Sequence, residues 1–117
     1  MSGINKDLNY VSGSHEAIAV GSTAGGTGFT AGKMALTVGN RPRSATMAVI
    51  TCEGGTVYYT TDGTVPLADG SLGHRIQDGE QASIKPWLDI SRFLAIALTG
   101  QSAILKVTYK FDSAMWQ

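Results

Sequence analysis

The fold class is decided by the stretch RFLAIALTGQSAILKVTYKF, residues 92–111. Its second half alternates strictly, with apolar residues at every second position (Leu105, Val107, Tyr109, Phe111) and polar residues between them (Lys106, Thr108, Lys110). A period of two predicts a half-exposed β-strand with its apolar side chains inward. The first half reads as another strand, and Gly100-Gln101 between the two halves reads as a turn.

The stretch SATMAVITC, residues 44–52, also alternates, but small and medium apolar groups occupy both of its faces. This pattern predicts a central strand buried between layers. A short Gly-containing connection, residues 53–55, leads to TVYYTTD, residues 56–62. Connections of this kind close hairpins, so we expect these two strands to pair antiparallel.

A second hairpin is predicted from GHRI and QASIKPW, residues 73–76 and 81–87, which flank the turn dipeptide Asp78-Gly79. The stretch PWLDISRF, residues 86–93, has room for one helical turn. Turn signals recur roughly every ten residues, and no segment carries a convincing helical period. The sequence therefore predicts an all-β fold, either a β-sandwich or a jelly-roll-like barrel.

The first third of the chain differs in composition. Residues 1–33 are rich in Gly, Ser, Thr and Asn, and one short alternation, HEAIAV at 15–20, interrupts them. The run GSTAGGTGFTAGK, residues 21–33, holds five glycines and is too small and polar to form a core alone. We expect residues 1–33 to form an N-terminal arm or extended segment, and residues 34–117 to form the β-sandwich domain.

Composition narrows the classes of partner. The 117 residues fit one domain, and nine Lys and Arg balance nine Asp and Glu, which argues against nucleic acid or an anionic membrane as the partner. No segment approaches the ~18 apolar residues that span a bilayer. Charged residues make up 15% of the chain, against about 25% in ordinary soluble domains. Weak self-repulsion favours association, so we expect a homo-oligomer or a larger assembly.

The sequence carries no recognisable motif for catalysis or for cofactor binding. Cys52 lies in an apolar alternating run and is expected to be a small buried side chain. His15 and His74 are the only histidines and are expected on the surface, with no spacing for zinc or a hydrolase triad. Thr27 and Met34 replace the first Gly and the Ser or Thr of a phosphate-binding loop. We expect no enzyme activity, no cofactor and no metal.

Two ligand classes fit residues of this chain, but a structural role explains each group of residues more simply. Four carboxylates around the long central loop would suit calcium, but Asp-Gly dipeptides are favoured as turn formers (Asp62, Asp69, Asp78, Glu80). Four aromatic residues would suit sugar stacking, but aromatics in strands are more often core or interface anchors (Tyr58, Tyr59, Trp87, Trp116). A carbohydrate-binding module requires exposed, coplanar rings, whereas an assembly protein requires Trp87 and Trp116 in the core or at an interface.

Two further features favour contacts with another protein. Arg41 and Arg43 lie on the extended stretch NRPRS, where they are able to pair with carboxylate or phosphate, although a solvated loop also fits. Trp116 lies in the terminal tail FDSAMWQ. A tail with Met and Trp is explained by anchoring to a neighbouring subunit or by folding back on its own chain.

The stretch VYYTTDGTVPLADG, residues 57–70, resembles the Tyr-Thr-x-Asp-Gly-Thr-x-Pro signature of small immunoglobulin-like β domains, including the C-terminal module of chitobiases. In that family the Asp-Gly turn and the proline shape a hairpin loop without a catalytic role. The chain departs from the pattern at Leu67, where that group often has Thr, and the match covers about a dozen residues. This resemblance implies a fold.

A longer resemblance, over residues 56–110, is to small structural proteins of tailed bacteriophages. The matching parts are the hairpin, a Gly-rich turn, an I-x-D-G-E-like step, a hydrophobic strand and a closing L-x-V-x-Y strand (59–66, 70–73, 76–80, 93–98, 105–109). Capsid decoration proteins and head-to-tail or tail components both fit this pattern.

The resemblance implies a non-enzymatic virion protein, assembled in the host cytoplasm, whose partners are the major capsid protein or other virion proteins. We expect a decoration, or cement, protein that binds across adjacent capsid proteins, with a head-to-tail component or a carbohydrate-binding adhesion module as alternatives. The candidate partner-contact residues are Asp62, Thr64, Pro66, Leu67, Asp69, His74, Arg41, Arg43, Phe29 and Trp116.

Overall fold

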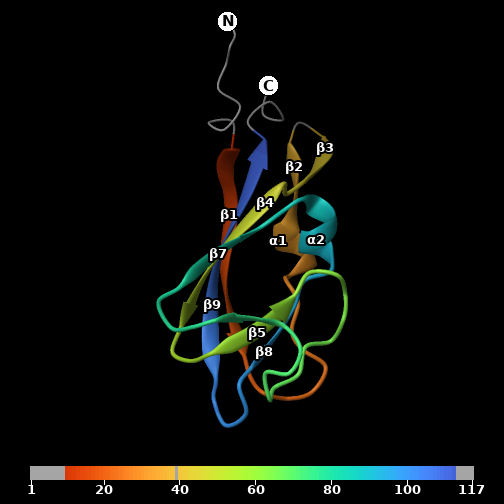
Figure 1. Ribbon diagram of the computed structural model, residues 1–117. Helices are drawn as coiled ribbons and strands as arrows, with labels where there is room; N and C mark the ends of the chain where they lie inside the picture. The colour runs from red at the N-terminus through yellow and green to blue at the C-terminus, as the bar shows by residue number, and fades with distance from the viewer. Residues whose placement is uncertain (1–9, 39, 113–117) are drawn as a thin grey trace, which may run out of the picture.

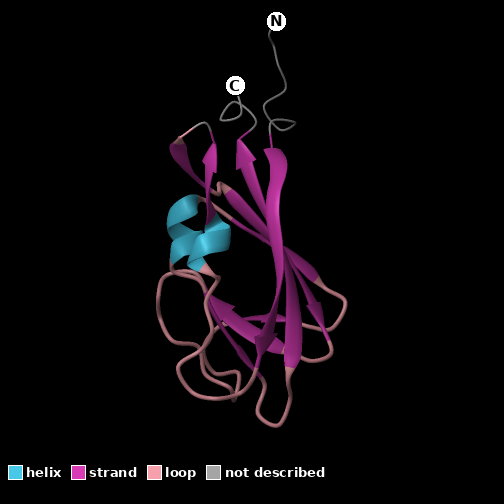
Figure 2. Ribbon diagram, turned by 180° about the vertical axis from the view of Figure 1, so that it is seen from behind, coloured by secondary structure: helices cyan, strands magenta, loops and turns pink. Residues whose placement is uncertain are grey.

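The computed structural model describes residues 10–38 and 40–112. Its elements, in chain order, are β1 Tyr10–Val20, α1 Ala31–Met34, β2 Ala35–Val38, β3 Arg41–Ser44, β4 Met47–Glu53, β5 Val57–Thr60, β6 His74–Ile76, β7 Gln81–Ile84, α2 Trp87–Ser91, β8 Leu94–Ala97 and β9 Ala103–Asp112. The strands form a four-stranded sheet (β1-β9-β4-β7), a three-stranded sheet (β6-β5-β8) and the hairpin β2-β3. The predicted all-β, sandwich-like fold is confirmed (Figures 1 and 2).

The four-stranded sheet is built on β9, which lies between β1 and β4. The predicted alternation of β9 is confirmed, because Leu105, Val107, Tyr109 and Phe111 are buried while the residues between them are exposed or half-exposed. These side chains form one core with β5 and β8 of the other sheet and with both helices. Burial of apolar surface on one face of each sheet is the main force that holds the two layers together.

β4 is central, as predicted, but only one of its faces is in the core. Alternate residues of this strand, beginning with Ala48, are buried, whereas Met47, Val49 and Thr51 are half-exposed. The prediction that layers bury both faces is therefore wrong for the residues that the structure describes. The apolar character of the outward face needs another explanation.

Neither predicted hairpin forms. β4 pairs with β9 and β7, and β5 pairs with β6 and β8, so the connections 54–56 and 77–80 cross from one sheet to the other. β9 offers a partner to all seven residues of β4, whereas β5 has only four residues. The two crossings lie side by side, because the Gly54 amide donates to Asp78 Oδ1 at 2.9 Å.

The segment assigned to an N-terminal arm contributes a strand to the main sheet. β1 pairs with β9 from Tyr10↔Asp112 to Val20↔Ala103, with a register shift at Gly13. The Gly-rich run that follows lies against β8, where Thr27 and Ala95 exchange backbone hydrogen bonds of 2.8 and 2.9 Å. From residue 10 onward, the structure therefore joins the predicted arm to the β-sandwich.

A hydrogen-bonded clamp fixes the end of this segment. Glu16 on β1 accepts hydrogen bonds from the hydroxyls of Tyr109 (2.5 Å) and Thr30 (2.6 Å). Burial, followed by the contact with Glu16, raises the pKa of the Tyr109 hydroxyl above its usual range. The clamp ties three distant parts of the chain together beside the core.

The remaining elements are short. The predicted helical turn is α2, and α1 precedes the hairpin β2-β3, which Figure 1 shows at the same end of the molecule as the start of β1 and the end of β9. Within the described residues, no helix is both long and apolar enough to cross a bilayer.

Candidate functional site

The feature with the most elaborate local structure is the loop of residues 61–73 between β5 and β6. Two Asp-Gly turns shape it, as predicted: Asp62 Oδ1 accepts from the Thr64 amide at 3.0 Å, and Asp69 Oδ1 accepts from the Ser71 amide at 2.9 Å. Gly63 and Gly70 follow with φ of 87° and 83°, which glycine adopts most easily. Hydrogen bonds from Thr64 and from Ser71 lower the pKa of Asp62 and of Asp69, respectively.

Contacts with the rest of the molecule hold this loop in place. The Thr60 hydroxyl donates to the carbonyl of Thr64. The Thr99 amide donates to the carbonyl of Ala68 at 3.0 Å, which ties the loop to the connection after β8. Pro66 is fully buried beneath the loop. The 61–73 loop is therefore held in one conformation by these contacts rather than being a flexible loop.

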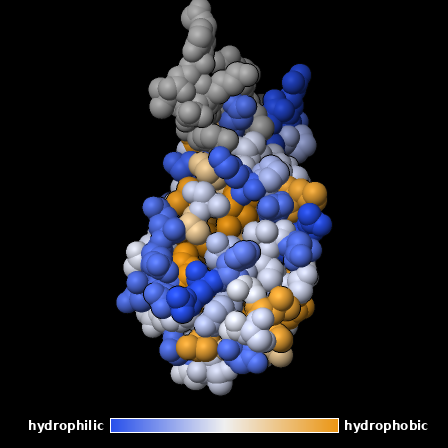
Figure 3. Space-filling view, viewed as in Figure 1, coloured by the Kyte–Doolittle hydropathy of each residue, from blue (hydrophilic) through white to orange (hydrophobic). Residues whose placement is uncertain are grey.

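This fixed loop exposes large apolar side chains. Val65, Leu67 and Leu72 are 43%, 47% and 41% exposed. The Leu67 amide donates to the carbonyl of Leu72 at 3.1 Å, so the two leucines come from adjacent backbone. Apolar surface gathers at the lower right of Figure 3, on the side where Figure 1 draws this loop. Exposed apolar groups on a rigid loop fit contact with another surface.

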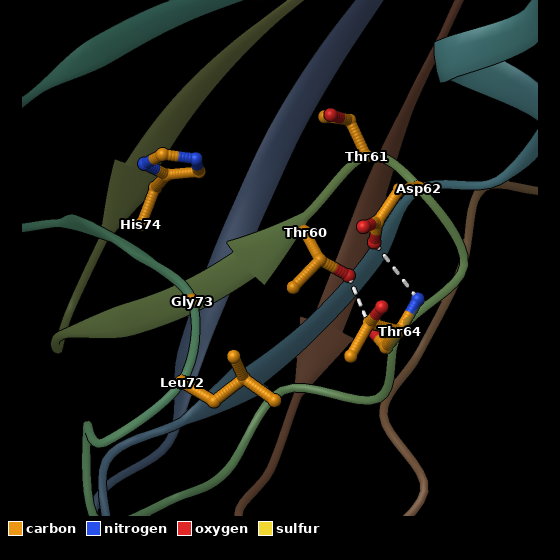
Figure 4. Close-up of a pocket in the computed structure, with 7 residues that line it drawn as sticks. All are labelled: Thr60, Thr61, Asp62, Thr64, Leu72, Gly73 and His74. Carbon is orange, nitrogen blue, oxygen red and sulfur yellow. Dashed lines mark hydrogen bonds between the residues drawn. The ribbon is translucent and has the colours of Figure 1, made fainter.

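A hollow of about 340 Å³ adjoins the loop, as Figure 4 shows. It is lined by Thr60, Thr61, Asp62, Thr64, Leu72, Gly73 and His74. The hollow thus brings together three of the predicted contact residues, Asp62, Thr64 and His74. Its hydroxyl groups, carboxylate and imidazole are able to hydrogen-bond to a partner, and Leu72 supplies an apolar wall.

The other predicted contact residues are distributed differently. Leu67 and Asp69 are exposed on the loop, and Arg41 is exposed on the hairpin β2-β3, away from it. Arg43 on the same hairpin is half-buried, with its Nε enclosed and unbonded. Trp116 lies outside the described residues.

Two predicted contact residues face inward in the structure. Pro66 is buried, so it shapes the loop and is not part of its outer surface. Phe29 packs against the core, with its ring stacked on Phe93 at 4.1 Å and edge-on to Tyr109 at 5.5 Å. The inclusion of Pro66 among the contacts is corrected because it is fully buried, whereas Phe29 is half-buried and its contact with a partner stays a prediction.

Sequence reasoning missed Val65 and Leu72. Both lie next to turn residues, in a loop where apolar and polar residues do not alternate regularly. No sequence pattern there distinguishes outward from inward side chains. Trp87 on α2 is 37% exposed and so lies outside the core.

The described residues contain no group of three or more His, Cys, Asp or Glu able to hold a metal ion. Cys52 is fully buried, as predicted. Burial, followed by the charge of Asp78, raises the pKa of its thiol, which disfavours the reactive thiolate.

Comparisons of the chain with protein-family models, with curated proteins and with solved structures find no significant match.

Proposed function

We propose that this chain is a non-enzymatic structural protein of a virion, and specifically a capsid decoration protein that binds across adjacent copies of the major capsid protein. The observation that carries the proposal is the fixed 61–73 loop with its three exposed apolar side chains. A loop that is already ordered loses little conformational entropy on binding, so its apolar contacts contribute more to affinity.

The resemblance of residues 56–110 to phage structural proteins supports the assignment to a virion. The balanced, sparse charge of the chain supports contact with protein rather than with nucleic acid. Many copies on a symmetric shell convert a modest affinity for each site into stable coverage.

Co-sedimentation with three kinds of target tests the proposal. The purified chain is mixed with capsid shells assembled without it, with isolated neck and tail complexes, and with immobilised glycans. Saturable binding to shells at a fixed ratio to the major capsid protein is the expected result. Binding to neck or tail complexes alone, or to glycans alone, would replace decoration with the corresponding alternative.

Loop variants show which surface makes the contact. Leu67→Asp combined with Leu72→Asp places two charges in the apolar part of the loop and is expected to weaken shell binding at least tenfold, because burying an unpaired charge is strongly unfavourable. Leu88→Asp is the matched control, since Leu88 is 55% exposed on α2 rather than on the loop. Equal loss of binding in both variants would exclude the loop as the specific contact.

A further inference from the structure

A second surface of the molecule is unusual. The four-stranded sheet has a face that points away from the core, here called the outer face. Its residues are Ser12, His15, Ala17 and Ala19 of β1, Ile104, Lys106, Thr108 and Lys110 of β9, Met47, Val49, Thr51 and Glu53 of β4, and Gln81 and Ser83 of β7. The other sheet and both helices pack on the opposite, buried side of this sheet.

The outer face mixes apolar, small polar and charged side chains. One face of an antiparallel sheet often meets water, and then polar and charged side chains normally cover it. Here the middle of the face carries Val49, Thr51 and Thr108 around Lys106, with Ala17 at its edge. Of its charges, Lys106 and Glu53 neutralise each other at 3.6 Å. The apolar side chains Met47, Val49 and Ile104 of this face would gain from being covered by another protein.

We propose that the outer face binds a second copy of this chain, with the strands of the two copies running in opposite directions. The register places Glu53 and Ile104 at one end of the face and Met47 and Lys110 at the other. A two-fold axis that lies in the interface and crosses the strands brings each end over the opposite end of the partner. Each Glu53 carboxylate then lies near the Lys110 ammonium of the other copy, twice by symmetry.

The shape of the two ends supports the same arrangement. A hollow of about 540 Å³ lies at the Glu53 end, lined by Ala19, Val20, Gly21, Glu53, Gly54, Ser102, Ala103 and Ile104. The opposite end carries two long, flexible side chains, Met47 and Lys110. In the proposed dimer these side chains enter the hollow of the other copy, with Glu53 at its wall. Methionine fills irregular apolar spaces well, and the lysine stem is itself apolar.

The area of the outer face indicates the affinity to expect for the dimer. Three strands about 4.8 Å apart, with seven residues rising about 3.4 Å each, and the four residues of β7 give roughly 400 Å² per copy. Two copies therefore bury roughly 800 Å², at the lower limit of specific interfaces. We expect a dimer in measurable equilibrium with its monomer rather than an obligate one.

Light scattering coupled to size exclusion tests the proposal across a concentration series. The wild-type chain is expected to approach twice its 12.2 kDa mass at the highest concentration and to dissociate on dilution. Val49→Lys places a charge in the middle of the face and is expected to give monomer throughout. Ala17→Glu is a second variant that keeps the fold, because position 17 is exposed and lies opposite Lys106 in the register. Circular dichroism verifies that each variant is folded.

Two further variants test the orientation, and a loop variant serves as control. Glu53→Lys or Lys110→Glu alone is expected to weaken the dimer, and the two together to restore part of it. Leu67→Lys leaves the outer face intact and should not change the mass. A wild-type monomer at every concentration overturns the proposal, and so does a dimer that survives both face substitutions. Because no shells are present, these results are independent of the proposed decoration role.

Discussion

Gly13 interrupts the pairing of β1 with β9, and the ring of Phe111 fills the space that a side chain would need. A Cβ atom built at Gly13 would lie 2.5 Å from two ring atoms of Phe111 and 2.9 Å from Leu36 Cδ1. The absence of a side chain lets β1 bulge while the aromatic ring covers the backbone. Composition shows that glycine is abundant in the chain, but it does not show that Gly13 is required for packing against Phe111.

Gly13→Ala is therefore expected to destabilise the fold by about 1–3 kcal/mol, the usual effect of overpacking a core. Urea denaturation measures the change. Gly21→Ala is the matched control, because a Cβ atom at Gly21 would meet nothing within 4 Å. Equal stability of the two variants would contradict the packing argument.

The carboxylates of the 61–73 loop give a second prediction at this scale. The Ser71 hydroxyl donates to Asp69 Oδ1 at 2.7 Å and lowers the pKa of Asp69 below the ordinary 3.8. A carboxyl whose pKa is lower in the folded state stabilises the fold above the unfolded pKa, and this contribution disappears as the pH falls through the folded pKa. The loop should therefore loosen only below about pH 4.

Ser71→Ala removes that hydroxyl and is expected to raise the pKa of Asp69 toward its ordinary value. Titration of the side-chain carboxyl carbons by NMR measures the shift. Asp62 provides an internal control, because its pKa is lowered by Thr64 and not by Ser71. An unchanged Asp69 titration in the variant would show that the hydroxyl has no such role.

At the scale of elements, the hydrogen bonds of the Glu16 clamp attach the Gly-rich segment, residues 21–33, to the domain. Tyr109→Phe removes one of the two hydroxyls that donate to Glu16 and leaves its carboxylate partly unpaired near the core. Loss of such a hydrogen bond is expected to destabilise the fold by about 1–3 kcal/mol. It should also raise amide exchange in residues 27–34, which hydrogen-exchange mass spectrometry measures. If the amides of residues 27–34 exchange at the wild-type rate in the variant, the proposed role of the clamp is wrong.

Most strands were predictable, except the hairpin β2-β3, and their partners were not. The alternation of β9 identified its buried residues because a strand with one face in water has a period of two. The short Gly-containing connections 54–56 and 77–80 suggested hairpins, yet each crosses between sheets. Local turn chemistry permits both outcomes, and the choice depends on which distant strand, such as β9, matches the length of β4.

The candidate site was predictable in part for the same reason. Asp62, Thr64 and His74 come together because the Asp-Gly turns return the chain to the strand beside β5. Turn signals are local, so sequence reveals them. The inward position of Pro66 and Phe29, and the outward position of Leu72, depend on packing between segments far apart in the chain.

At the scale of the whole molecule, two surfaces lie on different parts of the sandwich. The 61–73 loop belongs to the three-stranded sheet, and the outer face belongs to the four-stranded sheet. A decoration protein that is a dimer through one surface remains able to engage a shell through the other. We infer that two contact surfaces underlie the apolar groups that a chain with 15% charged residues carries at both places.

The stability of shells tests the central claim, decoration through the loop, most directly. Shells assembled without the chain are heated with and without it, and release of their contents is followed by fluorescence. We predict that the wild-type chain and the Leu88→Asp control raise the temperature of release, whereas the chain with Leu67→Asp and Leu72→Asp does not. An unchanged release temperature with saturating wild-type chain, or equal protection by the loop variant, would contradict the account.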